Sequence, residues 1–164
     1  RHRAVRRTLR DLIPLPRLYA QCPPELSIVS ADRVVDPGIP FELTAHDTPH
    51  LIVTRGEHSY EVGPFVIPGV TPCYQCSQLA RAAQDPFHLT HLRELEAWPL
   101  APLALLAHFA AAQRVGQLVM DFVSGALTES QCAQVATICD DGSVRVEDVE
   151  PASRCVCGIN GLAS

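Results

Sequence analysis

Two close pairs of cysteines constrain this chain more than any other feature. Cys73 and Cys76 are separated by two residues, and Cys155 and Cys157, nearly at the C-terminus, by one. A short spacing lets two sulfurs occupy neighbouring corners of a tetrahedron, so two such pairs predict a four-thiolate zinc site. With four protein ligands and no open position, the predicted role of the metal is structural.

Two other readings of these cysteines stay open at this point. Reduced cysteines also pack as small apolar residues in protein cores. A Cys-x-x-Cys pair can instead be a redox site, which fits less well here because a thioredoxin-like pair has no distant partner pair.

The pattern of apolar residues predicts one α/β domain built on a mixed sheet. A Gly-containing turn is expected to join strands 50–54 and 59–62 into one hairpin. A second Gly-containing turn is expected to join strands 134–138 and 143–146 into another, after which the chain returns toward Cys155. A helical crossover precedes the first hairpin. The expected strands are 26–29, 50–54, 59–62 continuing through 65–67, 134–138 and 143–146. The expected helices are 4–13, 41–47, 77–84 and 102–123.

The long helix carries apolar residues on most of its sides. One stripe has spacings of three and four, and further apolar residues widen it. The stripe consists of Leu105, Phe109, Ala112, Gly116, Val119 and Val123. Packing on one side of a sheet needs fewer apolar residues, so part of this surface is expected to meet another chain, as a homodimer or with a partner protein.

Composition narrows the class of protein. The 164 residues are 47% hydrophobic, enough for one core, and seven cysteines without a visible signal peptide favour the reducing cytoplasm. No uninterrupted apolar stretch reaches about 18 residues, so no membrane span is expected. The first residue is Arg1, which suggests a piece of something longer.

Charge is distributed unevenly. Residues 1–17 hold six arginines and one aspartate, a local charge of +5 within a chain of net charge −5. A basic arm can bind nucleic acid, but no aromatic residues are interleaved with these arginines, so no nucleic-acid partner is expected. We interpret residues 1–24 as a remnant of an upstream region and residues 25–164 as the folded part.

Several segments together resemble a known family. They are Pro49 to Val53, Glu61 to Gly69, Pro72 to Cys76 and Cys155 to Cys157. The chain resembles the ThiF-like, ubiquitin-activating-type domain of the cyclodehydratase partner proteins, or leader-peptide-binding proteins, that help form azolines in ribosomal peptide natural products such as bacteriocins. The resemblance implies that Cys73, Cys76, Cys155 and Cys157 hold zinc. It also implies a precursor peptide and a YcaO-type cyclodehydratase as partners.

The chain departs from ThiF-like adenylating enzymes at the nucleotide site. Those enzymes bind ATP through a Gly-rich strand-to-helix turn, whereas this sequence has no G-x-G-x-x-G and no lysine. We therefore expect the C-terminal half of such a domain, with no ATP binding by this chain alone. The sequence is either a fragment or a protein that has lost its nucleotide site.

Other candidate residues carry weaker signals. No histidine forms a metalloprotease motif, so each of five histidines is interpreted as a surface or turn residue: His46, His50, His58, His88 and His91. Cys22, Cys132 and Cys139 are left over, and a nucleophile among them is conceivable. Asp32 and Asp36 follow a predicted strand, where α/β folds place ligand groups, although a turn or cap role is favoured.

Three functions compete on this basis. The first is a non-catalytic scaffold that assists an ATP-using cyclodehydratase. The second is an ATP-dependent adenylating enzyme whose nucleotide half lies before Arg1. The third is a zinc-bearing interaction domain unrelated to peptide modification.

Overall fold

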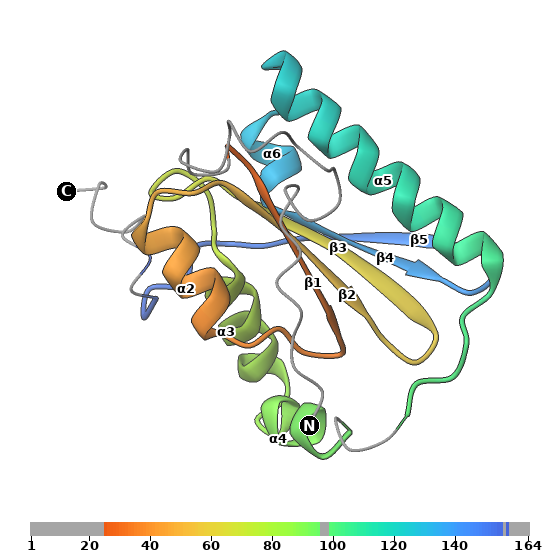
Figure 1. Ribbon diagram of the computed structural model, residues 1–164. Helices are drawn as coiled ribbons and strands as arrows, with labels where there is room; N and C mark the ends of the chain where they lie inside the picture. Colours follow the sequence, from red (N-terminus) through yellow and green to blue (C-terminus); the bar gives the residue numbers. More distant parts are fainter. Residues whose placement is uncertain (1–24, 96–98, 156, 158–164) are drawn as a thin grey trace, which may run out of the picture.

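The computed structural model describes residues 25–95, 99–155 and 157. In these residues one sheet is covered by helices on both faces (Figure 1). The strands are β1 (Ser27–Asp32), β2 (His50–Arg55), β3 (Ser59–Val66), β4 (Gln134–Cys139) and β5 (Val144–Asp148). The helices are α2 (Gly38–Ala45), α3 (Tyr74–Gln84), α4 (His88–Leu95), α5 (Leu105–Ser124) and α6 (Glu129–Cys132).

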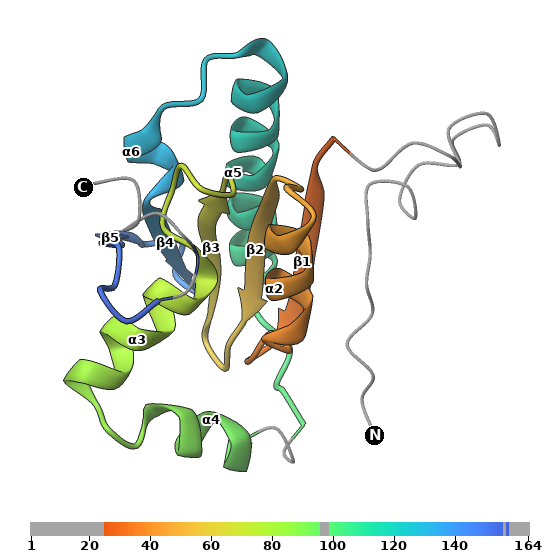
Figure 2. The same cartoon turned by 90° about the vertical axis from the view of Figure 1, so that its left-hand side faces the viewer.

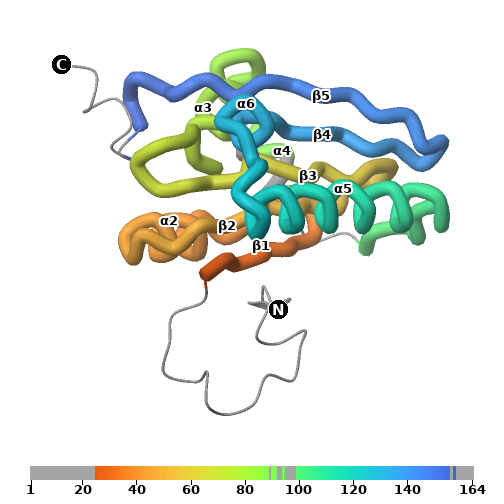
Figure 3. The backbone as a smooth tube through the Cα atoms, turned by 90° about the horizontal axis from the view of Figure 1, so that it is seen from above, coloured from red at the N-terminus to blue at the C-terminus, as the bar shows by residue number. Residues whose placement is uncertain are grey.

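The sheet is mixed, as predicted. Its strand order is β1-β2-β3-β4-β5, with β1 parallel to β2 and every other pair antiparallel. Helix α2 is the crossover between the two parallel strands. Figure 3 shows β1 at one edge of the sheet and the β4–β5 hairpin at the other. The predicted α/β class, crossover helix and C-terminal hairpin are confirmed.

The two faces of the sheet have separate cores, because neighbouring residues of a strand point to opposite faces. Leu51, Phe65 and Leu118 belong to the core under α5. On the other face, Ile52 packs with Tyr74 near α2 and α3. Figure 2 shows α5 behind the sheet and α2 and α3 in front of it.

Some predicted boundaries were wrong, and the causes are local. Strand β1 continues through Asp32, where a turn was expected. Helix α2 begins at Gly38 and not at residue 41, since the Asp36 carboxylate accepts a hydrogen bond from the Gly38 N–H at 2.9 Å. Pro40 is tolerated because the first helical turn needs no N–H donor there.

Two helices were not predicted. The polar stretch after Asp85 forms α4, and the Asp85 carboxylate accepts a hydrogen bond from the Phe87 N–H at 2.9 Å, as a cap does. The short helix α6 begins at a capping box in which Thr128 and Gln131 bond each other reciprocally.

The stripe predicted on the long helix is mostly exposed. The residues of α5 that face the sheet are Ala107, Ala111 and Leu118, whereas Leu105, Phe109 and Val123 are 67 to 72% exposed. The predicted helix is confirmed, although it begins at Leu105 and not at residue 102. Val115, Val119 and Phe122 also pack on the core under α5, and a second apolar strip that includes Phe109 is exposed.

No helix in the described part of the chain is both long and apolar enough to cross a membrane. The helix expected at residues 4–13 lies outside the described residues.

One buried histidine makes the fold sensitive to acid. The interpretation of His50 as a surface or turn residue was wrong, because it is fully buried at the start of β2. Its Nδ1 lies 2.9 Å from the Thr48 carbonyl oxygen. Its Nε2 has no hydrogen-bond partner among the described residues. Burial lowers the pKa of His50 below its usual value, because the charged ring would lose its hydration.

We predict that stability falls as the pH drops below about 6.5, the ordinary pKa of histidine. Below that pH the unfolded chain takes up a proton that folded His50 resists, so protonation favours unfolding. Urea unfolding between pH 7.5 and 5 should show this loss, and it should be smaller in His50→Leu. The exposed His46→Gln serves as the control, and an unchanged pH slope in His50→Leu would contradict the prediction.

Candidate metal centre

The first cysteine pair lies at the start of α3. Cys73 is the residue that caps this helix, and Cys76 lies in its first turn. The N-terminal end of a helix carries a partial positive charge, which favours thiolates at this position. The segment after β5 returns to the same place, guided by a hydrogen bond from the Val149 N–H to the Ala133 carbonyl oxygen at 2.6 Å.

All four predicted ligands meet at one point. The Sγ atoms of Cys73, Cys76, Cys155 and Cys157 lie within 4.8 Å of one another. The Cys73–Cys76 and Cys76–Cys157 sulfur distances are 3.8 Å, and the Cys73–Cys155 distance is 3.4 Å. A tetrahedral zinc ion with bonds of about 2.3 Å separates its sulfurs by about 3.8 Å. The cluster therefore has the dimensions of a zinc site, and all four cysteines are free thiols.

The surroundings favour a structural site. Cys73 and Cys76 are buried and Cys155 and Cys157 are half-buried. The cluster packs against apolar side chains from β3, β4 and the segment after β5, namely Val66, Val135, Val149 and Ala152. Four protein ligands in an apolar setting leave no position for a substrate.

The pKa values of the clustered thiols are also consistent with a bound cation. The Cys73 thiol donates to Cys76, which lowers the pKa of Cys76 to about 5 and raises that of Cys73. The Ala152 N–H, 3.4 Å from the Cys76 sulfur, supports the same thiolate. Burial raises the pKa of Cys155 to about 11. Four sulfurs this close cannot all ionise unless a cation balances them, and zinc would supply that charge.

The other candidate residues do not join this cluster. Among the described residues it is the only group of three or more potential metal ligands, so the histidines form no second site. Cys132 is buried, and burial raises its pKa to about 11, which opposes a role as nucleophile. Cys139 is half-buried at the end of β4, and Cys22 lies outside the described residues. Asp32 is the exposed last residue of β1.

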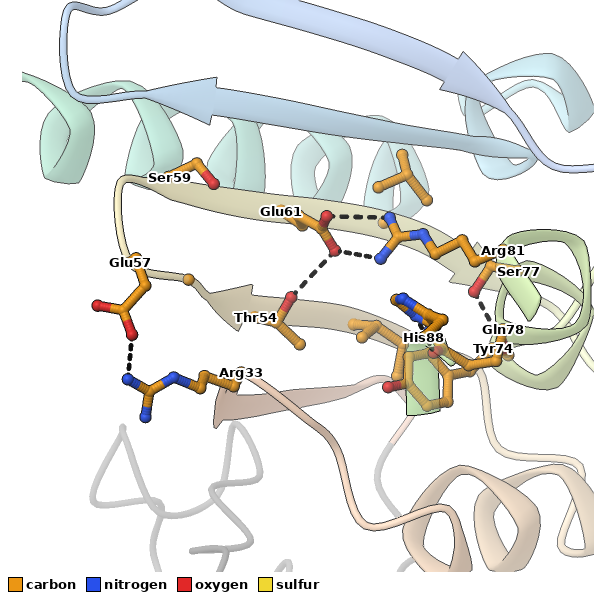
Figure 4. Close-up of a pocket in the computed structure, with 14 residues that line it drawn as sticks. Arg33, Thr54, Glu57, Ser59, Glu61, Tyr74, Ser77, Gln78, Arg81 and His88 are labelled. Carbon is orange, nitrogen blue, oxygen red and sulfur yellow. Dashed lines mark hydrogen bonds and ion pairs between the residues drawn. The ribbon is translucent and has the colours of Figure 1, made fainter. Parts of the chain in front are cut away.

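A second polar site was missed by sequence reasoning. A cavity of about 190 Å³ lies between the β2–β3 hairpin and helices α3 and α4, on the sheet face opposite α5 (Figure 4). Its central contact is the pair between Glu61 and Arg81, 20 residues apart. No local motif links residues so far apart, so only the fold reveals the cavity.

Comparison with known proteins agrees with this architecture. No family model matches the sequence, and no curated protein matches it. Among solved structures, E. coli MccB with MccA has a TM-score of 0.63 at 17% identity, covering 85% of this chain and 41% of MccB. MccB with ATP has a TM-score of 0.64 at 15% identity, covering 87% of this chain and 42% of MccB.

A heterocyclase bound to substrate and cofactor has a TM-score of 0.61 at 17% identity, covering 84% of this chain but 21% of the heterocyclase. The fold is ThiF-like. The chain spans about two-fifths of MccB and one-fifth of the heterocyclase. At these identities the likeness establishes the fold, not the activity.

Proposed function

We propose that this chain is a non-catalytic, zinc-bearing partner in the maturation of ribosomally made, bacteriocin-type peptides, where it assists an ATP-using cyclodehydratase of the YcaO type. The observation that carries the proposal is a ThiF-like fold shared with MccB, named as a microcin C7 biosynthetic enzyme and solved with MccA, and with a heterocyclase solved with substrate and cofactor. The closed four-cysteine cluster supports a scaffold, because it offers no catalytic position. Residues 25–164 then correspond to the C-terminal half of a ThiF-like domain.

Association with the two proposed partners tests this function. The chain, a YcaO-type cyclodehydratase encoded beside it and the precursor peptide should form a complex in calorimetric titration or light scattering. The expected result is binding of both partners. Absence of binding to either partner by correctly folded protein would leave a zinc interaction domain unrelated to peptide modification as the better account.

A second candidate function has a specific observation in its favour. MccB has been solved with ATP, and this chain spans only 42% of MccB. The ThiF-like fold is therefore also compatible with part of an ATP-dependent adenylating enzyme. A G-x-G-x-x-G turn in the upstream reading frame would favour that function over the scaffold.

We predict that the chain alone does not bind ATP. A Gly-rich phosphate loop and lysine are both missing from the sequence, so the phosphates would lack their usual partners. Calorimetric titration with ATP and magnesium should give no binding below about 1 mM. Sub-millimolar binding would contradict this prediction.

The exposed side of α5 supports a homodimer. Its outer flank, defined as Leu105, Phe109, Ala112, Gly116, Val119 and Val123, contains no ionisable side chain, and only Val119 also packs on the core under α5. The sequence of this flank is nearly symmetric about residue 114: two small residues at the centre, and larger ones at equal distances on both sides. Two copies of α5 crossing antiparallel would place Ala112 beside Gly116 and Leu105 beside Val123, as a two-fold interface requires.

We predict that Phe109→Glu weakens self-association at least about tenfold, since the charge would be buried in both subunits. Analytical ultracentrifugation should measure the shift, with Gln84→Glu, an exposed residue of α3 on the other face of the sheet, as the control. A wild-type mass near 17.8 kDa at tens of micromolar would contradict the dimer.

We place the protein in the cytoplasm, because reducing conditions keep four clustered thiols available to a metal.

A further inference from the structure

The cavity opposite α5 is partly open to solvent and is lined mainly by polar residues from strands, hairpin and helices. Its floor is formed by β2 and β3, and its walls by α3, α4 and the β2–β3 hairpin (Figure 4). The apolar contribution comes from Ile52 and Val135. Its volume is about 190 Å³. This suits one amino-acid side chain and is smaller than the ~300 Å³ or more of drug-sized ligand sites.

The charges lining the cavity cancel. Arg81 donates two hydrogen bonds to the Glu61 carboxylate, at 2.9 and 3.0 Å, and Thr54 Oγ1 lies 3.4 Å from the same carboxylate. Arg33 forms an ion pair with Glu57. Two arginines and two glutamates thus line the site in matched pairs, as Figure 4 shows.

The remaining polar groups of the wall are uncharged. The Tyr74 hydroxyl accepts a bond from the Val35 N–H at 3.4 Å, and burial raises the pKa of Tyr74, which keeps its proton available for donation. His88 Nε2 lies 3.3 Å from Gln78 Oε1. Burial, and then the charge of Arg81, lowers the pKa of His88, so this ring stays neutral at neutral pH. The wall can therefore donate and accept hydrogen bonds without a net charge.

We propose that this cavity binds one uncharged polar residue of a peptide, and that its two arginine–glutamate pairs select against carboxylates. An anionic ligand would face Glu57 and Glu61, and could reach Arg81 only in competition with Glu61. A cationic ligand would face Arg33 and Arg81 in the same way. An amide group both donates and accepts hydrogen bonds, as the wall does. The peptide origin of the ligand rests on the proposed function, whereas the charge selection rests on the cavity alone.

Two matched probes test the selection in the full chain. N-acetyl-glutamine methylamide is uncharged, and N-acetyl-glutamate methylamide has the same shape with a carboxylate. Titrations followed by the backbone amide NMR signals of Gly56, Glu61 and Gln78 should show the glutamine probe binding at least about fivefold more tightly. No shift of these signals with either probe, or equal or tighter binding of the glutamate probe, would overturn the proposal.

Removing one negative charge should reverse the preference. In Glu61→Gln, Arg81 loses its carboxylate partner, so the glutamate probe should bind more tightly than the glutamine probe. If Glu61→Gln does not fold, Glu57→Gln is the second test. It removes a charge at the rim of the cavity and should shift the preference in the same direction. Glu150→Gln, an exposed residue outside the cavity, is the control and should retain the original preference.

An unchanged preference in folded Glu61→Gln or Glu57→Gln would contradict the role of the pairs. The titrations contain no cyclodehydratase, so their failure is distinguishable from failure of the proposed function. If the chain binds the cyclodehydratase and the precursor but neither probe, the proposed ligand of the cavity is wrong and the proposed function still stands.

Discussion

Purified protein is expected to contain about one zinc ion per chain, and Cys76→Ser is expected to lose most of it. The four sulfurs already lie at tetrahedral spacing, and Cys76 is the fully buried member that contacts both Cys73 and Cys157. The metal binds only the folded chain, so its loss should lower the free energy of unfolding. We expect a decrease of at least about 3 kcal/mol, a fraction of the ~10–16 kcal/mol measured for structural zinc in small peptides.

Elemental analysis and urea unfolding together measure this effect. Cys139→Ser is the matched control, because Cys139 is half-buried but lies outside the cluster. Zinc should remain in this variant, and its stability should change little. Less than about 0.3 zinc per wild-type chain, under conditions that keep the thiols reduced, would contradict a zinc site.

Gly63→Ala is expected to destabilise the fold by at least about 3 kcal/mol. Gly63 has a φ of 119°, which residues with a side chain rarely adopt. A Cβ atom there would overlap the Gln134 carbonyl oxygen, so strands β3 and β4 would have to separate. The cavity and the metal centre both depend on this part of the sheet, since Val135 contributes to each.

The same substitution at Gly116 provides the control. Gly116 lies in α5, and within one chain a methyl group added there would meet only open space, so alanine should stabilise the helix of the monomer by roughly 0.5 to 1 kcal/mol. Because Gly116 belongs to the proposed dimer flank, both variants are compared at a protein concentration at which the chain is monomeric. Opposite signs for the two variants in urea unfolding are expected. A loss below about 1 kcal/mol in Gly63→Ala would show that the strands adjust more easily than their spacing implies.

The meeting of the four cysteines could be predicted from sequence because the signal of each pair is local. Each cysteine pair has its own spacing signal, and only one further step, the return of the chain after β5, was needed to join Cys73 to Cys155. The strands were predictable for the same reason, since alternating apolar residues and Gly turns lie within a few residues of one another. The capping box at Thr128 was also visible in the sequence and would have located α6.

The cavity and the outer flank of α5 could not be predicted in this way. The Glu61–Arg81 pair depends on how α3 packs against β3, which no local pattern encodes. For α5, the periodicity of Phe109 and its neighbours identifies an apolar side but not which side meets the sheet. The small residues Ala107 and Ala111 face the sheet because the helix packs closely there.

Reconstituted peptide dehydration tests the central claim of a non-catalytic partner most directly. The cyclodehydratase, ATP and the precursor peptide are incubated with and without this chain, and mass spectrometry counts the water molecules lost from the peptide. We expect rapid ring formation only when the chain is present, and no adenylation of the peptide when the chain replaces the cyclodehydratase. Equal ring formation without the chain, or peptide adenylation by the chain alone, would contradict the account.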